Sequence, residues 1–268
     1  MATEIRVRDL HKSFGDLHVL RGVEVEITES ACVILLGANG CGKSTMMRCL
    51  NGLVRPDRGQ VRLGGDDLAS TRGPGLRRAR RRLGMVFQQF NLVPNLSVLQ
   101  NVLYGALGQQ AGGLVRTMAP LAPNRLRAQA MHCLDRVGLA QHASQPCREL
   151  SGGQQQRVAI ARTLLQNPDV ILADEPVASL DPQAGRQVMD LLREIVRDQG
   201  ITVLCSLHQL DLAREYGDRV IGMKAGEIAL DQPRAALSAE RMEQLYHGVV
   251  RVDDLPQARA TPALAAAG

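Results

Sequence analysis

The chain contains few aromatic residues and few lysines. Three Phe, three Tyr and no Trp occur among its 268 residues, and only three of its 32 basic residues are lysine. Proteins that bind single-stranded nucleic acid stack bases on aromatic side chains, and the densest basic stretch, residues 77–82, contains none. This argues against such a surface. The net charge of +5 leaves nucleic acid or acidic lipid headgroups open as partners, but arginines spread over solvated faces explain it more simply.

Signals for export or membrane insertion are also missing. No uninterrupted apolar run approaches the ~18 residues of a membrane span, and residues 1–6 lack the charged-then-apolar layout of a signal peptide. The six cysteines form no C-x-x-C pair, which indicates reduced, mostly buried thiols rather than a disulfide framework or a metal site. We therefore expect a cytoplasmic chain that acts at a membrane only through a partner.

The most informative stretch is a glycine-rich loop that follows the apolar run 32–36 and opens a helical segment. The loop consists of Gly37, Ala38, Asn39, Gly40, Cys41, Gly42, Lys43, Ser44 and Thr45. Strand, G-x4-G-K-[ST] and helix form the phosphate-binding loop pattern, in which backbone N–H groups and the helix N-terminus surround an anion. The pattern predicts that Lys43 reaches the β- and γ-phosphates of a nucleotide and that the Ser44 hydroxyl binds Mg²⁺.

Cys41 lies inside this loop, beside the start of the helix. A helix N-terminus lowers the pKa of a nearby thiol. We therefore expect Cys41 to be alkylated readily and to be protected by bound ATP.

Three further apolar runs end in polar side chains that suit the same site. These side chains are Gln88, the pair Asp174 and Glu175, and His208. In open α/β sheets, ligands bind outside the carboxyl ends of the strands, so the four strand ends are expected to meet. Asp174 is then placed to hold Mg²⁺ with Ser44, and Glu175 to polarise the attacking water. Gln88 would bind Mg²⁺ or position water, and His208 would sense or stabilise the γ-phosphate.

A second phosphate-binding element is predicted at Ser151, Gly152, Gly153 and Gln154, directly before a helix. Ser151 is a good N-cap residue, and the glycines leave backbone N–H groups free to face an anion. One chain would then hold two half-sites. Two copies related by a two-fold axis, with two nucleotides between them, would complete both.

The rest of the chain can be divided into segments by its pattern of apolar and polar residues. Residues 4–10 and 19–27 alternate as half-buried strands do, which predicts an antiparallel sheet beside the nucleotide core, with residues 11–16 as its turn. Phe14, in that turn, is either a minor core residue or a face on which a base stacks. Residues 91–147 contain helical patterns, over 98–107 and 123–137, without a clear strand, as expected of a helical insertion. A further helix is expected near 237–246.

Residues 150–154, Leu-Ser-Gly-Gly-Gln, resemble the signature motif of the ATP-binding cassette (ABC) family. Other positions match the motifs of this family in turn: residues 37–45 the Walker A loop, Gln88 the Q-loop, Asp174 the end of the Walker B strand, Glu175 the catalytic glutamate, Asp181 the D-loop, His208 the switch histidine, and Phe14 the aromatic residue that stacks on adenine, where tyrosine is commoner. The resemblance covers roughly residues 3–250.

The resemblance implies an α/β fold with a RecA-like P-loop core, an N-terminal antiparallel β subdomain and an inserted α-helical subdomain. The core with its β subdomain would comprise residues 1–88 and 161–252, and the helical subdomain residues 89–160. Residues 253–268, rich in Pro and Ala, are expected to be a disordered tail.

The function that the resemblance implies is that of the ATPase subunit of a bacterial importer. It would bind ATP and Mg²⁺ in a sandwich with a second copy of itself, on the cytoplasmic face of the inner membrane. Its other partners would be an integral membrane permease, docked near the Q-loop and the helical subdomain, and indirectly a periplasmic substrate-binding protein; no nucleic acid is expected. Residues 87–93, 101–108 and 207–211 most resemble phosphonate-importer ATPases.

Three alternatives remain at this point. Polar amino-acid importer ATPases share much of residues 87–93. A soluble ABC protein acting on nucleic acid would fit the arginine excess, but such relatives usually carry two cassettes or a long coiled-coil insertion. A metabolic P-loop kinase would not need the Ser151 segment.

Overall fold

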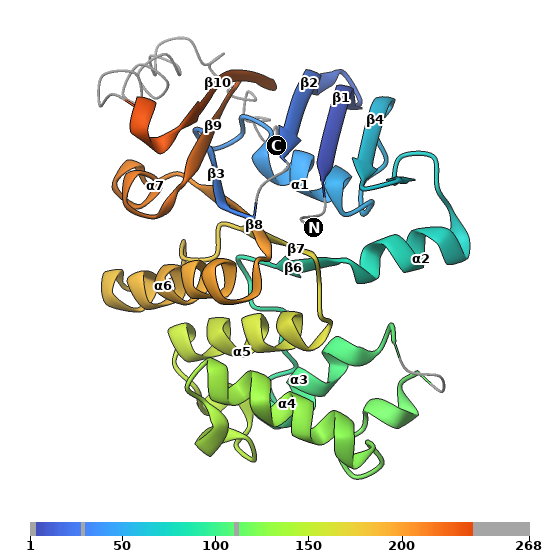
Figure 1. Ribbon diagram of the computed structural model, residues 1–268, viewed down its shortest axis with the longest axis vertical. Helices are drawn as coiled ribbons and strands as arrows, with labels where there is room; N and C mark the ends of the chain where they lie inside the picture. Colours follow the sequence, from blue (N-terminus) through green and yellow to red (C-terminus); the bar gives the residue numbers. More distant parts are fainter. Residues whose placement is uncertain (1–3, 28–29, 110–112, 238–268) are drawn as a thin grey trace, which may run out of the picture.

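The computed structural model describes residues 4–27, 30–109 and 113–237. They form two β-sheets with helix α1 packed between them. A separate group of helices lies on the far side of the second sheet (Figure 1). Within the described residues, no helix is long and apolar enough to cross a membrane.

The first sheet is antiparallel and has the strand order β2-β1-β4-β5. Its strands are β1 (Ile5–Phe14), β2 (Leu17–Ile27), β4 (Arg58–Leu63) and β5 (Asp66–Asp67). Alternate side chains of β1, from Ile5 and Val7, are buried and the intervening ones are not, as the sequence pattern predicted. The turn is shorter than expected, since β1 continues to Phe14 and only Gly15 and Asp16 separate the two strands.

The second sheet has six strands in the order β10-β9-β3-β8-β7-β6. They are β3 (Cys32–Leu36), β6 (Leu83–Val86), β7 (Val170–Asp174), β8 (Thr202–Leu207), β9 (Arg219–Lys224) and β10 (Glu227–Pro233). All neighbouring pairs from β9 to β6 are parallel, and β10 pairs antiparallel with β9. Strands β3, β7 and β8 therefore end at one edge of the sheet.

Both faces of this sheet are buried, which explains the uninterrupted apolar strands. Val33 and Leu35 of β3 face a core shared with α1 (Lys43–Leu50) and the first sheet, whereas Ile34 and Leu36 face a core shared with α6 (Pro182–Gln199). Helix α7 (Leu210–Tyr216) also lies against this second face, where it contacts β3 and β8.

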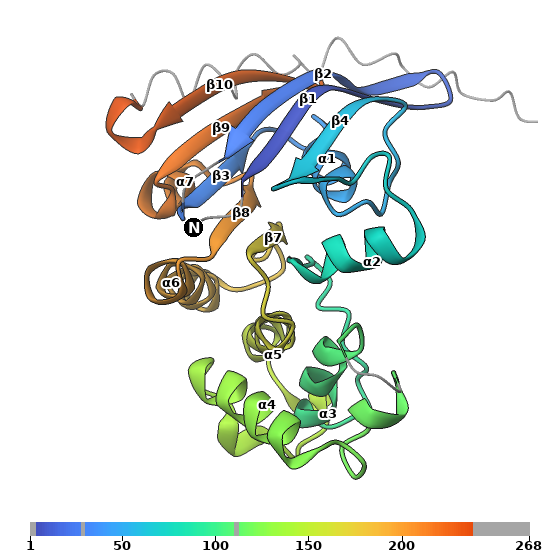
Figure 2. The same cartoon turned by 45° about the vertical axis from the view of Figure 1, so that its right-hand side comes forward.

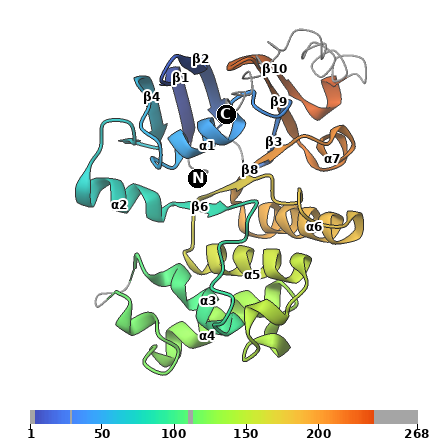
Figure 3. The ribbon, with the colours of Figure 1, turned by 180° about the vertical axis from the view of Figure 1, so that it is seen from behind.

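The helical region consists of α3 (Val98–Leu103), α4 (Asn124–Arg136) and α5 (Gly152–Leu165), with short 3-10 turns between them. Helix α5 lies between the other two helices and the second sheet in all views (Figures 2 and 3). The arginine-rich helix α2 (Gly73–Arg81) lies outside this helical region and directly precedes β6 in the chain.

Several expected boundaries differ from the observed ones. The helix expected over residues 98–107 ends at Leu103, and a 3-10 turn (Tyr104–Ala106) follows it. Helix α5 starts at Gly152 and runs without a break past residue 160, where the helical subdomain was expected to end. The helix expected near residues 237–246 and the tail at 253–268 lie outside the described residues.

Candidate functional site

The glycine-rich loop leaves β3 and turns directly into α1. Gly40 and Gly42 have φ of 80° and 108°, in the left-handed region that favours glycine. A Cβ on Gly37 would lie 2.5 Å from the carbonyl oxygen of Met223, and one on Gly42 would lie 3.1 Å from that of Val19. These contacts exclude larger side chains, so the loop can take this shape only with glycine at these positions.

Lys43, the first residue of α1, is only 4% exposed. Its Nζ donates hydrogen bonds to the carbonyl oxygens of Gly37 at 2.7 Å and Ala38 at 3.1 Å. It also lies 3.6 Å from Oε1 of Glu175. The ammonium group is therefore fixed inside the loop, next to the end of β7.

A cluster of oxygen atoms lies where β7 and β8 end. Oδ1 of the buried Asp174 accepts hydrogen bonds from the hydroxyls of Ser44 and Ser206, each at 2.9 Å. The pairing of Asp174 with Ser206 in the sheet register brings the two together. A hydroxyl and a carboxylate at this spacing are hard oxygen ligands of the kind that Mg²⁺ prefers.

Glu175 follows Asp174 in a left-handed backbone conformation, with φ of 48°. Such a conformation costs a non-glycine residue about 1–3 kcal/mol and persists only where the surroundings hold it. Here the Glu175 N–H donates to Oγ of Ser206 at 2.8 Å. The carboxylate lies between Lys43 and His208, whose Nδ1 is 3.7 Å from Oε2. The structure therefore brings together the ends of β3, β7 and β8, as the sequence predicted.

Ser206 is the residue of this cluster that the sequence did not single out. It is fully buried, and it holds both Asp174 and the backbone of Glu175. The signal available in the sequence was a small hydroxyl residue near the end of a largely apolar strand, two positions before His208.

Within the described residues, Gln88 and Phe14 form no hydrogen bond or ion pair with this cluster. Gln88 follows β6 and is exposed, although the pairing of Val86 with Ala173 puts the end of β6 beside the end of β7. Phe14 is 51% exposed at the end of β1, with Nζ of Lys12 5.3 Å from its ring centroid. An exposed ring does not fit the core interpretation, and the stacking interpretation stays a prediction.

Ser151 is the N-cap of α5, as predicted. Its Oγ accepts from the N–H of Gln154 at 3.3 Å, and Oε1 of Gln154 accepts from the N–H of Ser151 at 2.9 Å, which completes a capping box. A Cβ on Gly153 would lie 2.8 Å from Cβ of Ala184 on α6, so glycine permits the close approach of these helices. Asp181 caps α6 through Oδ1. Both caps are exposed.

Two polar side chains of α5 tie the helix to the neighbouring loops. Nε2 of the buried Gln156 donates to the carbonyl oxygens of Phe87 at 3.3 Å and Pro176 at 2.9 Å. Arg162 donates to the carbonyl oxygens of Phe90 and Asn91. The segments that follow β6 and β7 are therefore both attached to the helix that Ser151 begins.

The structure argues against the expectation that Cys41 is alkylated readily. Its side chain is only 7% exposed, and burial raises the pKa of the thiol above its ordinary value, an effect that the nearby charge of Lys43 opposes only in part. The position at a helix N-terminus is outweighed because Cys41 is buried in the core that α1 shares with the first sheet.

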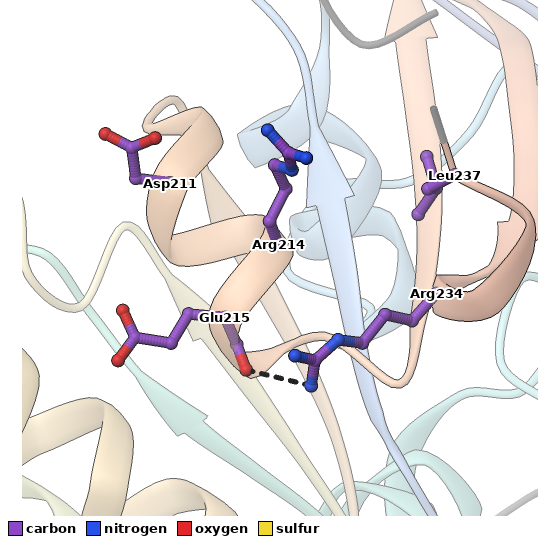
Figure 4. A pocket seen from close by; sticks show the side chains of 5 residues that line it. All are labelled: Asp211, Arg214, Glu215, Arg234 and Leu237. Carbon is purple, nitrogen blue, oxygen red and sulfur yellow. Dashed lines mark hydrogen bonds between the residues drawn. The ribbon is translucent and has the colours of Figure 1, made fainter. Parts of the chain in front are cut away.

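A groove of about 500 Å³ lies elsewhere, beside α7. Figure 4 shows its lining, where Arg234 donates to the carbonyl oxygen of Glu215 at 3.2 Å. None of its five lining residues belongs to the predicted site.

Comparison with known proteins identifies the family. A sequence model described as ABC transporter matches residues 20–178. The chain belongs to the ABC transporter family. The fold class expected from the resemblance is thereby confirmed.

Curated relatives align with this ABC protein over most of its length. The phosphate-import ATP-binding protein PhnC of Mycolicibacterium smegmatis is 48% identical, over 90% of this chain and 91% of its own. The phosphonates import ATP-binding protein PhnC 2 of Oceanobacillus iheyensis is 42% identical, over 91% and 96%. The hypophosphite import ATP-binding protein HtxD of Stutzerimonas stutzeri is 42% identical, over 90% and 70%.

Solved structures of the ABC family agree with the fold. One is a dimeric ATP-binding cassette in a post-hydrolysis state with ADP and Pi, 33% identical, with a TM-score of 0.75 over 87% of this chain and 100% of its own. Another is CbiO1 from Clostridium perfringens, part of the ABC transporter complex CbiONQ, 31% identical, with a TM-score of 0.78 over 91% and 93%.

Proposed function

We propose that this chain is the ATPase subunit of a bacterial importer, and that the imported compounds are phosphonates. The observation that carries the ATPase assignment is the cluster of Lys43, Ser44, Asp174, Glu175 and His208 at one edge of the second sheet. The substrate class rests on the relatives, which import phosphate, phosphonates or hypophosphite by name. All of these are small phosphorus oxyanions.

The loop fits the triphosphate of ATP. Lys43 brings a buried positive charge to the end of β3, and α1 adds its N-terminal N–H groups and the positive end of its dipole. Residues 37–45 would hold the phosphates, and the exposed Phe14 would stack on the adenine.

The Ser44 hydroxyl and the Asp174 carboxylate fit Mg²⁺, which is usually held by few protein oxygens together with phosphate and water. The described residues contain no group of three or more His, Cys, Asp or Glu side chains arranged around a metal, which agrees with that mode of binding. Bound there, the ion would neutralise charge on the phosphates. Gln88 would contribute a further ligand or position water.

Glu175 would act on the attacking water. Its carboxylate would accept a proton from that water as the water oxygen attacks the γ-phosphorus and the bond to the β–γ bridging oxygen breaks, so that the products are ADP and phosphate. His208, 3.7 Å from Glu175, would orient this carboxylate and donate to the γ-phosphate. Positioning and charge stabilisation account for most of the catalysis in phosphoryl transfer.

A second copy of the chain would complete each site. Ser151, Gly152, Gly153 and Gln154 would face the nucleotide held by the partner's loop, together with Asp181. The exposure of both helix caps supports this arrangement, and so does the dimeric state of a related cassette.

The permease would dock near the Q-loop and the helical region, on the side that also bears α2. A cleft of about 520 Å³ there is lined by Arg77, Arg80 and Arg81 of α2 and by the turn at Gly105–Gly108. The chain would thus lie on the cytoplasmic face of the inner membrane, and a periplasmic binding protein would deliver the substrate to the permease.

The substitution Glu175→Gln tests the ATPase assignment. We expect turnover to be lost and dimers to accumulate in Mg-ATP, because binding is intact and hydrolysis no longer opens the sandwich. Size-exclusion chromatography with light scattering would detect these dimers, and Glu227→Gln, an exposed change on β10, is the control. A Glu175→Gln protein that hydrolyses ATP normally, or stays monomeric at saturating Mg-ATP, contradicts the assignment.

Uptake by cells tests the substrate class. Cells that express the complete transporter should take up a radiolabelled alkylphosphonate, and Lys43→Ala should abolish this uptake. Uptake of polar amino acids in its place would indicate the alternative importer group.

A further inference from the structure

The side chains of Asp9, His11 and His18 form a connected group on the hairpin of strands β1 and β2. Nε2 of His11 lies 2.8 Å from Oδ1 of Asp9, and Nδ1 of His11 lies 3.4 Å from Nε2 of His18 on the opposite strand. The two imidazole rings are inclined by only 21°, with centroids 5.5 Å apart. The nucleotide site proposed above uses none of these residues.

The backbone around this group departs from the geometry of a regular strand. The pairing of β1 with β2 shifts register on both sides of Leu10, and Asp9 has a φ of 47°. A Cβ on Gly59 would lie 2.2 Å from the carbonyl oxygen of Asp9, so only glycine fits opposite the deformation. Bulges of this kind re-aim side chains, and here they turn Asp9 and His11 toward each other.

The contacts of Asp9 fix how the His11 ring is turned. The Asp9 carboxylate lies 2.8 Å from Nη2 of Arg58 and, through Oδ1, 2.8 Å from Nε2 of His11. An ionised carboxylate only accepts hydrogen bonds, so Nε2 of His11 carries the proton. Nδ1 is then the ring nitrogen that faces Nε2 of His18, at a hydrogen-bonding distance of 3.4 Å.

The distance between the two facing nitrogens matches a metal-binding pair. Zinc binds imidazole nitrogen at about 2.0–2.1 Å in tetrahedral geometry, which separates two such ligands by about 3.3–3.4 Å. A carboxylate on the other ring nitrogen is the usual support of a metal-bound histidine. An ion held by both rings would lie to one side of the line between the nitrogens, which a small rotation of the exposed His18 ring allows.

We propose that His11 and His18 bind a divalent transition-metal ion of the zinc, nickel or copper class, with Asp9 orienting His11. Imidazole is a preferred ligand of these ions. The site is open, because the described residues offer no third His, Cys, Asp or Glu in a metal-binding arrangement, and water completes the coordination. All six cysteines are buried and do not compete for the ion.

The local charges permit a bound cation. Arg58 is paired with Asp9, and Nζ of Lys12 is paired with Oδ1 of Asp57 at 2.7 Å. The ion would join the two strands of the hairpin across its width. It would therefore stabilise the native state, since a ligand that binds only the folded chain raises its melting temperature.

Titration of the full-length chain, without an affinity tag, with Zn²⁺ tests the site, and Co²⁺ serves as the spectroscopic probe of imidazole coordination. We expect His11→Gln and His18→Gln each to lose one equivalent of bound metal and the accompanying rise in melting temperature. Asp9→Asn should weaken binding about 10-fold or more, while its backbone stays in place because asparagine tolerates a positive φ. The double variant His132→Gln and His142→Gln, which removes two histidines outside this hairpin, should bind like the wild type.

The outcome that overturns the proposal is equally specific. His18 is exposed, so His18→Gln keeps the fold, and circular dichroism in the absence of metal verifies this. If His18→Gln binds Zn²⁺ with unchanged stoichiometry and affinity, or if the control variant loses the bound equivalent, the two facing histidines are not the site.

Discussion

Replacement of Ser206 by alanine is the most direct test of what positions Asp174 and Glu175. The Ser206 hydroxyl is fully buried, donates to Asp174 at 2.9 Å and accepts from the N–H of Glu175 at 2.8 Å. Alanine removes a hydrogen bond to a charged group, which is worth about 1.5–3 kcal/mol, and leaves an N–H without a partner, which costs about 1–3 kcal/mol. The two effects share one atom and are not additive. We expect a total loss of about 2–4 kcal/mol.

Urea denaturation followed by circular dichroism measures this loss. With an m-value near 3 kcal/mol/M, the midpoint should fall by roughly 1 M. The matched control is Cys205→Ala, which shortens the neighbouring buried side chain of the same strand without removing a bond to Asp174. Its cost should be near the ~1 kcal/mol of an average substitution.

The ATPase assay adds a second readout. Without Ser206, the left-handed backbone of Glu175 loses its hydrogen-bond partner, and a misplacement of about 1 Å at such a group can reduce turnover about 100-fold. Equal stability of the two variants together with a normal rate for Ser206→Ala would refute the reasoning, because the hydroxyl would then position nothing.

Three further predictions follow from the same geometry. His208→Ala should lower ATP turnover by roughly 100-fold, the typical cost of losing one charge-stabilising donor, with nucleotide affinity retained; unchanged turnover in steady-state assays would remove His208 from the site. Gly37→Ala should cost about 1–3 kcal/mol by overpacking and abolish ATP binding in calorimetry, because the new Cβ would meet the Met223 carbonyl; normal affinity would mean that the loop can shift. Cys41 should react with maleimide far more slowly than free cysteine at pH 7 and faster at higher pH, since burial raises its pKa; mass spectrometry that finds rapid labelling at pH 7 would contradict this.

The convergence of strand ends could be predicted from the sequence because it depends on local patterns. Apolar runs of four to six residues that end in Asp174 or His208 specify parallel strands, and parallel strands bring their carboxyl ends to one edge. The N-cap role of Ser151 was equally local, since a serine followed three residues later by glutamine is a capping box.

The parts that sequence reasoning missed depend on tertiary packing. Ser206 acquires its role from the register between β7 and β8, which no local pattern specifies. Cys41 was assigned from its position at a helix N-terminus, but its burial comes from distant parts of the chain, including Met223, that pack against the loop. The bulges that bring Asp9 to His11 likewise appear only when β1 is paired with both neighbours.

Helix α5 also connects two regions of the molecule mechanically. Its 14 residues span about 21 Å, with Ser151 at one end and the attachments of Gln156 and Arg162 along its length. Glycine occurs only in its first turn, so nothing farther along softens it. We therefore expect a shift of the segment after β6 to move α5 and its Ser151 end with it, which would couple the side of the molecule that bears α2 to the face that would meet a second copy.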